Sequence, residues 1–224
     1  MRSLFHTIMG KGGVVNPLWT NLIHYYKSDS TATDSVGTAN GTLVNGTSYS
    51  AGLINNAFDF DGVNDYVSFS QPLLPNSGDW SFNIWVYIDS ITGASGQILD
   101  CGSNQASTYY WLAWEPSINK YRFLVDGSFY ITTAVSAIGS WKMLTITHKA
   151  STNYKIYLNG VLGDTGASTA NPNFTTANFL MNRLALSPSN IYNGRSDEFG
   201  CWSRELTQSD ITELYNSGNG LQYT

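Results

Sequence analysis

Apolar and polar side chains alternate most regularly over residues 80–88. The apolar ones hold every second position: Trp80, Phe82, Ile84, Val86 and Ile88. Successive side chains of a strand point to opposite faces, so this pattern predicts a central strand with one face on a hydrophobic core. Residues 141–148 and 179–186 supply further predicted strands.

Two dipeptides predict tight turns between neighbouring strands. Asn159-Gly160 follows the apolar segment 154–158 and precedes another short apolar pair, while residues 120–126 and 128–133 flank Asp126-Gly127. Both dipeptides favour the positive φ angles of a two-residue hairpin, and Asn-Gly is the stronger signal. We therefore expect two β-hairpins.

The C-terminal region has the pattern of one short helix. Thr207 as N-cap and Asp210 at the third helical position form a capping box, and Leu206 is placed to pack on Ile211. Gly218 is placed to end the helix after about three turns. Its apolar face holds three residues at helical spacing: Ile211, Leu214 and Tyr215.

The chain divides into an N-terminal segment, residues 1–20, and one domain, residues 21–224. The segment is Gly-rich and unpatterned, which fits either a terminus without fixed structure or an arm that docks on a partner. From residue 22 short strands alternate with turn residues: 22–26 and 41–44 are strands and 27–40 is a polar loop. A chain of 224 residues with 42% hydrophobic content can bury a full core as a single all-β domain.

Composition excludes several partners. Charged residues make up 12% of the chain, the net charge is −5 and Lys and Arg form no cluster, so we expect neither nucleic acid nor anionic lipid to bind. An apolar stretch of the roughly 20 residues that a membrane helix needs is missing, and we expect no membrane insertion. The apolar run at the start is short and interrupted by His6 and Thr7, so no secretory signal is evident.

Cysteine and histidine residues give no pattern of catalysis or of a metal centre. Cys101 and Cys201 either form a disulfide or are two buried free thiols. A chain of this size does not need a disulfide for stability, and we predict free thiols. The three histidines, His6, His24 and His148, are scattered and lack a neighbouring nucleophile motif.

Several segments together resemble the concanavalin A-like, laminin-G-like jelly rolls, a fold that the pentraxins share. The resemblance runs from about residue 21 to the C-terminus and rests on segments in the family's order: 58–67, 80–86, 141–147 with 157–160, and 194–206 followed by 209–211. It implies an all-β fold, a two-sheet antiparallel jelly-roll sandwich with one concave sheet and one short C-terminal helix.

This fold hosts glycan-binding lectins, adhesion modules and glycosidases, so the resemblance does not assign an activity. Glycosidases of the fold carry closely spaced acidic residues that alternate along one strand. Such an array is missing: Asp197 and Glu198 are adjacent and should point to opposite faces, and Glu115 has no acidic partner in its strand. We expect no catalysis, with a glycosidase as the residual alternative.

The resemblance also suggests a structural calcium ion, because many relatives bind Ca²⁺ with loop carboxylates. Asp34 precedes Gly37 and Asn40 in the polar loop, as in the family's acidic loop, so Asp34 with Asp197 is the preferred pair of ligands. The alternative is that these acidic residues only fix turns. Three other candidates lie in the segment 58–67: Asp59, Asp61 and Asp65.

The segment 109–115 is the candidate for sugar binding, because it would place aromatic rings on both faces of one strand. Alternation sends Tyr109 and Trp111 to one side and Tyr110, Leu112 and Trp114 to the other. The alternative is that both faces are buried. The predicted ligand-binding residues are Tyr109, Trp111, Trp114, Glu115 and Tyr130, with Asn104 and Gln105 as further polar contacts.

These observations predict a non-catalytic recognition or adhesion module that binds a glycan or surface polysaccharide at an extracellular or virion surface. The alternative is a structural phage virion protein whose jelly roll mediates protein contacts. In either setting, residues 1–20 are the candidate for docking to other virion or cell-surface proteins.

Overall fold

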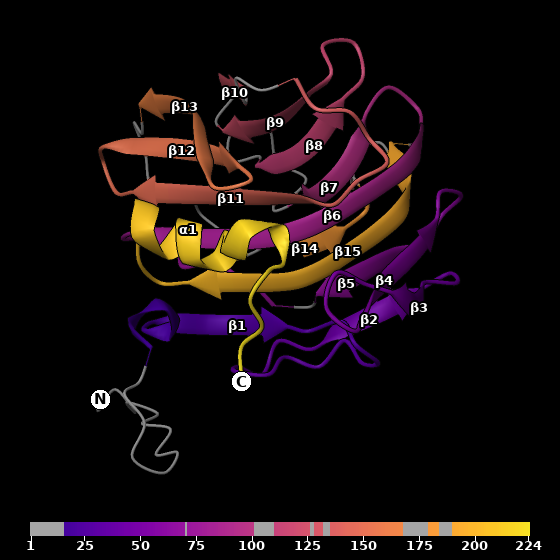
Figure 1. The fold of residues 1–224 in the computed structure, drawn as a ribbon, viewed down its shortest axis with the longest axis horizontal. Helices are drawn as coiled ribbons and strands as arrows, with labels where there is room; N and C mark the ends of the chain where they lie inside the picture. The colour runs from indigo at the N-terminus through magenta and orange to yellow at the C-terminus, as the bar shows by residue number, and fades with distance from the viewer. Residues whose placement is uncertain are drawn as a thin grey trace.

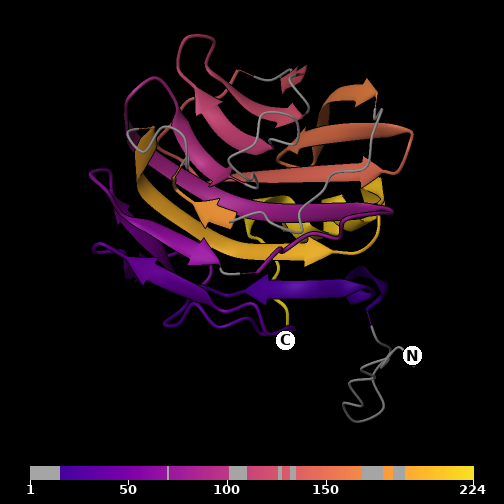
Figure 2. The ribbon, with the colours of Figure 1, turned by 180° about the vertical axis from the view of Figure 1, so that it is seen from behind.

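Two antiparallel sheets pack face to face in this computed structural model (Figures 1 and 2), as the resemblance predicted. The structure describes residues 16–69, 71–100, 110–125, 128–131, 135–167, 179–183 and 190–224, without the side chains of 125, 128–131 and 179. Within these residues the fold is a jelly-roll sandwich with a single α-helix, α1 (Gln208–Tyr215).

Sheet A has eight strands in the described part of the chain. In spatial order they are β13 (Val161–Ala167), β12 (Asn153–Leu158), β11 (Lys142–Lys149), β6 (Trp80–Thr92), β15 (Ile191–Trp202), β4 (Asn56–Asp61) and β3 (Ser48–Ala51), and β1 (Leu22–Tyr26) also pairs with β15. Its two longest strands, β6 and β15, lie side by side at the centre.

Sheet B has seven strands among the same residues. In order they are β10 (Ser128–Ile131), β9 (Lys120–Val125), β8 (Trp111–Glu115), β7 (Gly96–Asp100), β14 (Phe179–Met181), β5 (Tyr66–Phe69) and β2 (Gly41–Val44). The predicted strands at 22–26, 41–44 and 141–148 are confirmed to within one residue, and β14 is shorter than predicted.

The central strand β6 is confirmed, and its pattern explains the main core. Its five alternating apolar side chains, from Trp80 to Ile88, are all buried between the sheets. The opposite face of β6 is also buried over Ser81, Asn83 and Trp85, because later parts of the chain cover it.

Both expected hairpins form. Asn159 (φ 51°) and Gly160 (φ 81°) join β12 to β13 and take the two positive φ angles of a type I′ turn. Strands β9 and β10 pair directly, with Val125 opposite Ser128, and the dipeptide between them lies outside the described residues.

The capping box of α1 is confirmed: the Thr207 hydroxyl accepts from the Asp210 amide, and the Asp210 carboxylate accepts from the Thr207 amide. The helix ends earlier than predicted. Asn216, with φ 45°, is its left-handed C-cap, and residues 216–218 continue as a 3₁₀ turn. An Asn accepts this conformation more readily than most side chains, so Gly218 is not the residue that stops the helix.

A second apolar cluster lies on the outer face of sheet A, beneath α1 and the two terminal segments. It contains Leu18, Leu22, Tyr25, Trp85, Met143, Tyr157, Trp202, Leu206, Ile211 and Leu214. Figure 1 shows α1 in front of β6, between β11 and β15 and roughly parallel to them, with the C-terminal segment running on towards β1. This layer covers the part of the outer face that carries Trp85, Met143 and Trp202.

Residues 16–20 pack on this face, although they lie within the segment 1–20 that the sequence separated from the domain. Leu18 in the 3₁₀ turn η1 (Pro17–Trp19) is buried, its carbonyl accepts from Trp202 Nε1 at 2.9 Å, and Arg204 Nε donates to Thr20 O at 2.9 Å. Residues 1–15 lie outside the described part, so their docking stays a prediction. None of the described helices is long and apolar enough to cross a membrane.

Candidate functional site

Strand β8 presents the two faces that its alternation predicts, but they differ in burial. Tyr110, Leu112 and Trp114 belong to the core between the sheets, and Trp114 is 6% exposed. Trp111 and Glu115 lie on the outer face of sheet B and are half-buried. Trp114 is therefore a core residue in this structure, whereas Trp111 and Glu115 are within reach of a ligand.

Arg122 of β9 connects these two residues. Its Cζ lies 5.4 Å from the centre of the Trp111 ring, and its Nη1 donates to Glu115 Oε2 at 2.9 Å. Glu115 Oε1 also accepts from Ser117 Oγ at 3.0 Å. The β8–β9 register places Ala113 opposite Arg122, so both Trp111 and Glu115 are its diagonal neighbours on one face.

Arg122 was not among the site residues predicted from the sequence. The sequence does place Arg122 in a predicted strand, two residues after its start. If this strand is paired with β8, alternation puts Arg122 on the same face as Trp111 and Glu115. The pairing of β8 with β9, however, depends on a register that the sequence alone did not give. The site is therefore a half-buried cluster of one ring, one guanidinium and one carboxylate.

The other predicted contacts fall outside what the structure describes. Tyr109, Asn104 and Gln105 are not among the described residues. Tyr130 lies in β10 and pairs with Phe123 of β9, but its side chain is not described either. Their part in ligand binding stays a prediction.

Asp34, the first predicted calcium ligand, holds its own loop together. Its carboxylate accepts from four backbone amides and lies 2.6 Å from His24 Nδ1. Burial alone would raise the pKa of Asp34, but the hydrogen bonds from His24 and from the backbone outweigh it and hold the pKa at about 2. Asp34 is thus an ionised carboxylate surrounded by N–H donors.

Asp197, the second predicted calcium ligand, lies beside Glu198 in a β-bulge of β15. The sequence predicted opposite faces for these two residues, and that prediction is wrong. The register with β6 shifts between Asp197 and Gly200, and Glu198 has a φ of 49°. The extra residue turns both carboxylates to the outer face of sheet A.

Each carboxylate of the bulge has its own partners. Asp197 Oδ2 accepts from the Leu53 and Ile54 amides at 2.9 and 3.1 Å. Glu198 accepts from the Tyr25 hydroxyl, and from Gln222 Nε2 at 2.7 Å. Neither group forms an ion pair with a described residue, so burial raises the pKa of Glu198 to about 7, and burial together with the neighbouring Glu198 raises the pKa of Asp197 to about 8.

Asp34 and Asp197 therefore bind two different backbone segments. Among the described residues, no group of three or more His, Cys, Asp and Glu side chains is arranged to hold a metal ion. Calcium at Asp34 and Asp197 stays a prediction. Cys201 is a buried free thiol whose pKa burial raises, and Cys101 lies outside the described residues.

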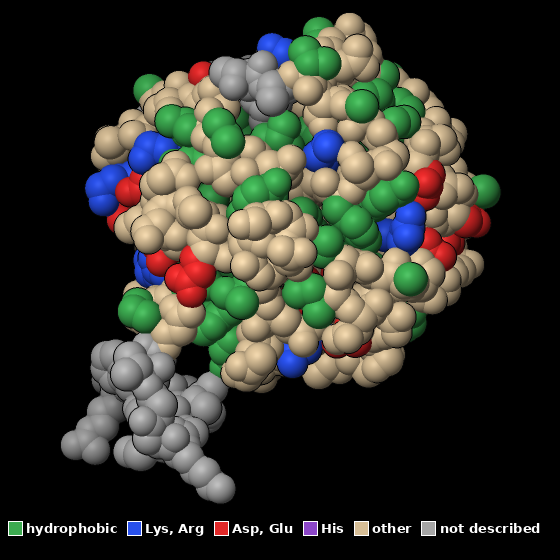
Figure 3. Space-filling model, viewed as in Figure 1, with side chains coloured by type: hydrophobic (Ala, Val, Ile, Leu, Met, Phe, Trp, Pro, Cys, Tyr) green, Lys and Arg blue, Asp and Glu red, His purple; other side chains and the backbone are tan. Residues whose placement is uncertain are grey.

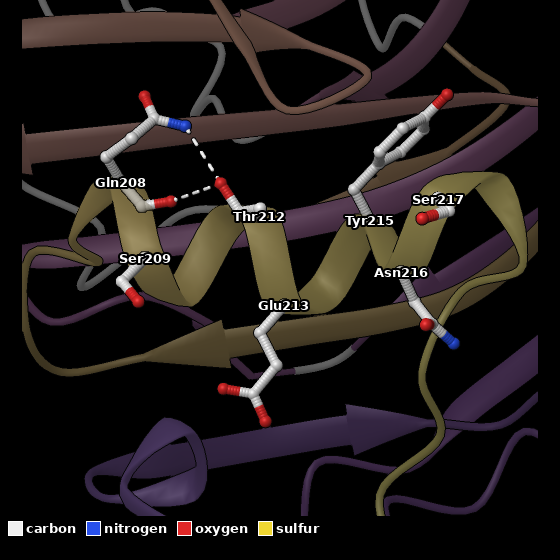
Figure 4. Close-up of a pocket in the computed structure, with 7 residues that line it drawn as sticks. All are labelled: Gln208, Ser209, Thr212, Glu213, Tyr215, Asn216 and Ser217. Carbon is white, nitrogen blue, oxygen red and sulfur yellow. Dashed lines mark hydrogen bonds between the residues drawn. The ribbon is translucent and has the colours of Figure 1, made fainter.

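A shallow depression of about 750 Å³ lies on the surface of α1 (Figure 4), on the opposite side of the sandwich from Trp111. It is lined by polar helix side chains and by Tyr215. Gln208 Nε2 donates to Gly160 O at 2.8 Å and Thr212 Oγ1 donates to Gln208 O at 2.8 Å, so these groups bond within the fold. The depression adds no second set of convergent groups to the Trp111 cluster.

Comparison with solved structures supports the architecture. Domain 4 of AbnA, an extracellular arabinanase from Geobacillus stearothermophilus, is 19% identical with a TM-score of 0.68, covering 87% of this chain and 98% of that one. The binding domain of Paraclostridial Mosquitocidal Protein 1 is 16% identical with a TM-score of 0.73, covering 90% of this chain and 53% of that one. At these identities the likeness is one of fold.

Sequence comparison gives the family. Botulinum neurotoxin type C from Clostridium botulinum C phage is 30% identical over 169 residues, which are 71% of this chain, and the chain spans 12% of the toxin's length. The sequence profile of the concanavalin A-like lectin/glucanases superfamily matches residues 61–212. This range includes β5 to β15 and the start of α1, and the chain therefore belongs to the concanavalin A-like lectin/glucanases superfamily.

Proposed function

We propose that the protein is a non-catalytic recognition module that binds carbohydrate on the outer face of sheet B. The observation that carries this proposal is the contact of Arg122 with both Trp111 and Glu115. Trp111 is the stacking surface of the site, and Arg122 and Glu115 are its polar groups.

The chemistry of the cluster suits a sugar. An indole face packs against the C–H groups of a pyranose or furanose ring, and it is rigid, so little conformational entropy is lost on binding. A guanidinium donates to ring and hydroxyl oxygens, and a carboxylate accepts from hydroxyl groups. The ion pair of 2.9 Å between Arg122 and Glu115 holds both groups in place before the ligand arrives.

Known relatives favour a glycan ligand. The matching arabinanase domain, nearly all of which this chain covers, is described in complex with arabinotriose. Cell entry of botulinum neurotoxin type C is described as dependent upon interaction with two ganglioside molecules, but this chain covers only 53% of the solved toxin chain. The arabinanase domain is thus the better guide to the ligand class, a neutral oligosaccharide.

The placement of the acidic residues supports a role without catalysis. Glu115 is bound to Arg122, whereas a pair of glycosidase carboxylates needs open access to one glycosidic bond. Asp197 and Glu198 have the raised pKa values of acid catalysts, but they are buried on the outer face of sheet A beneath the C-terminal segment. Their burial explains the pKa values without any substrate.

Display at an extracellular or virion surface is the setting that we propose for this module. Residues 16–20 pack on the outer face of sheet A, so an arm formed by residues 1–15 would leave the molecule from that side and keep the Trp111 face free. The test deletes residues 1–15 and measures how much of the protein is incorporated into the virion. Unchanged incorporation would reject the arm as the docking segment.

The binding proposal is tested on a glycan array with the full chain. We expect Trp111→Ala to weaken binding at least about tenfold, through loss of the stacking surface, and Trp111→Phe to retain part of it. Val161→Ser is the matched control, because Val161 is exposed in the β12–β13 hairpin. Equal binding by the wild type and Trp111→Ala would contradict the proposal.

The calcium prediction is tested on the same protein by thermal unfolding in calcium and in excess chelator. A bound structural ion raises the melting temperature by mass action. A lower melting temperature in chelator, which Asp34→Asn abolishes, would support calcium at this residue. Identical melting curves would contradict it.

A further inference from the structure

A second aromatic and charged cluster lies on the other side of the sandwich, on the outer face of sheet A. It follows one row across five neighbouring segments: Ser48 in β3, Asp59 in β4, Arg195 in β15, Tyr87 in β6 and Trp141 just before β11. Because paired residues of neighbouring strands point to the same face, one row brings these side chains together.

The aromatic half of the row is a corner of two rings. The rings of Tyr87 and Trp141 are 5.7 Å apart and meet at 70°, in an edge-to-face contact. The Cζ of Arg195 lies 4.2 Å from the centre of the Tyr87 ring and 5.8 Å from that of Trp141. The guanidinium thus lies over the Tyr87 ring and, at the longer distance, over the Trp141 ring.

Arg195 is held in this position by the backbone and not by a tight ion pair. Its Nη1 donates to Ala51 O at 3.2 Å, whereas Asp89 Oδ2 is 3.7 Å from its Nη2. The side chain of Asp89 is 48% exposed and that of Arg195 is 24% exposed. Both groups therefore have hydrogen-bonding capacity that faces solvent.

The row lies at the edge of the layer that covers sheet A, and Trp141 packs against the apolar cluster of that layer. Tyr87 and Trp141 are half-buried, while Trp85, two residues before Tyr87, is buried beneath Tyr215 at a ring distance of 5.8 Å. Figure 3 shows this side of the molecule, where hydrophobic side chains are exposed among polar ones over the strands beside α1.

We propose that this row is a second carbohydrate site, which binds a neutral sugar. Trp141 and Tyr87 supply the apolar surface for the sugar's C–H groups, Arg195 donates to its oxygens, and Asp89 accepts from its hydroxyls. The site stands apart from the Trp111 site, because the two lie on the outer faces of different sheets.

Charge decides between neutral and acidic sugars. Asp59 belongs to the row and Asp89 lies beside Arg195, so two carboxylates accompany one guanidinium. The whole chain has a net charge of −5. An acidic sugar would meet net repulsion, whereas hydroxyl groups are good donors to these carboxylates. A protein or peptide partner would be a competing occupant of the same surface.

The experiment uses ¹H–¹⁵N NMR of the tryptophan indole N–H signals in the full chain. Trp141→Phe and Trp111→Phe identify the two signals that matter. The probes are arabinotriose, xylotriose, cellotriose and maltotriose, with trigalacturonic acid as the acidic control. We expect a neutral probe to shift the Trp141 signal, and the acidic probe to leave it in place.

Variants then separate the two sites by calorimetric titration with the probe that binds. We expect Trp141→Ala to weaken binding at the sheet A site at least about tenfold. Asp89→Ala weakens it as well, and since Asp89 is largely exposed this variant keeps the fold. Trp111→Ala and Val161→Ser leave the shift of the Trp141 signal unchanged.

Each outcome supports or overturns one or both of the two binding proposals. A shift of the Trp111 signal alone would overturn the second site and support the first. A shift of the Trp141 signal alone would do the reverse. No shift of either signal with any neutral probe would overturn both, and a Trp141 shift that only the acidic probe or a peptide causes would overturn the assignment to a neutral sugar.

Discussion

Two neighbouring rows of sheet A have similar chemistry and opposite surroundings. In one row Trp85 of β6 pairs with Asp197 of β15; in the next, Tyr87 pairs with Arg195. Each row combines an aromatic ring with a charged or ionisable group. The first lies beneath Tyr215 of α1 and the terminal segments, and the second lies at the edge of that layer.

The difference shows that the covering layer decides what such a row can do. Under the layer the carboxylates keep their protons to a higher pH, with a pKa of about 8 for Asp197 and about 7 for Glu198, because burial disfavours the charged form. Beyond the layer Arg195 and Asp89 stay hydrated and can bind a ligand. One row stabilises the fold, and the other is open to a ligand.

The largest effect is expected from removing the layer's apolar contact. Ile211 is fully buried between α1 and sheet A, so Ile211→Ala should lower the free energy of unfolding by about 2–5 kcal/mol, measured by urea denaturation. Val161→Ala, in an exposed position, should change it by less than about 0.5 kcal/mol. Equal losses in the two variants would show that the layer contributes little.

The second prediction concerns the pH dependence of the covered row. The pKa of Glu198 is about 7 in the folded state and 4.5 for the free side chain, so its neutral form contributes stability that is complete below pH 4.5 and is lost as the pH rises through 7. Asp197 adds a loss in the same direction, because its pKa rises from 3.8 for the free side chain to about 8 in the folded state. The wild type should therefore lose stability as the pH rises from about 4 to about 8.

Glu198→Gln tests this loss directly. The amide keeps an acceptor for Gln222, and its NH₂ group can donate to the Tyr25 hydroxyl, which also donates to Leu221 O at 3.2 Å. The variant should be more stable than the wild type by about 1–3 kcal/mol near pH 8.5 and close to it near pH 5. Glu213→Gln, an exposed acid of α1, is the control, and an equal pH slope in all three proteins would contradict the prediction.

A third, smaller effect should follow from loosening the start of α1. Thr207→Ala removes the N-cap and should cost about 1 kcal/mol, whereas Thr207→Ser should restore most of it. Thermal unfolding measures the loss. Because the open row does not contact the N-cap, sugar binding at Trp141 should stay the same, and a parallel loss of binding would mean that the two rows are coupled.

The smallest effect on stability is expected in the open row itself. Arg195→Lys replaces a partly exposed guanidinium and should change the free energy of unfolding by less than about 0.5 kcal/mol. A lysine ammonium lacks the planar fork that lies on Tyr87 and donates to Ala51 O, so sugar affinity should still fall several-fold. A large loss of stability with unchanged affinity would assign Arg195 to the fold.

Local patterns predicted the parts of the fold that depend on local chemistry. The alternation around Trp80 gave β6, the Asn159-Gly160 dipeptide gave its hairpin, and the capping box gave the start of α1. Each of these signals acts within a few residues of the chain. The end of α1 was less well predicted, because both Asn216 and Gly218 can take a positive φ.

Features that depend on pairing between distant strands were harder to predict. The bulge at Asp197 and Glu198 is visible only from the register with β6, and without it alternation sends the two carboxylates apart. Alternation placed Trp111 and Trp114 on opposite faces but did not say which face is the outer one, and the contact of Trp111 with Arg122 needed the register of β8 with β9. Predicting the row of Tyr87 and Arg195 would also have required the order of the strands in sheet A.

The meeting of both terminal segments on one face of sheet A has a consequence for protein engineering. The ring of Trp19 lies 5.4 Å from that of Tyr223, and Asn16 Nδ2 donates to Glu213 Oε1 at 2.5 Å. A short linker could therefore join residue 224 to residue 16, and new ends opened in the exposed β12–β13 hairpin would give a circular permutant with the same sheets. Such a molecule could be tethered from the hairpin end, which turns the outer faces of both sheets sideways to the support.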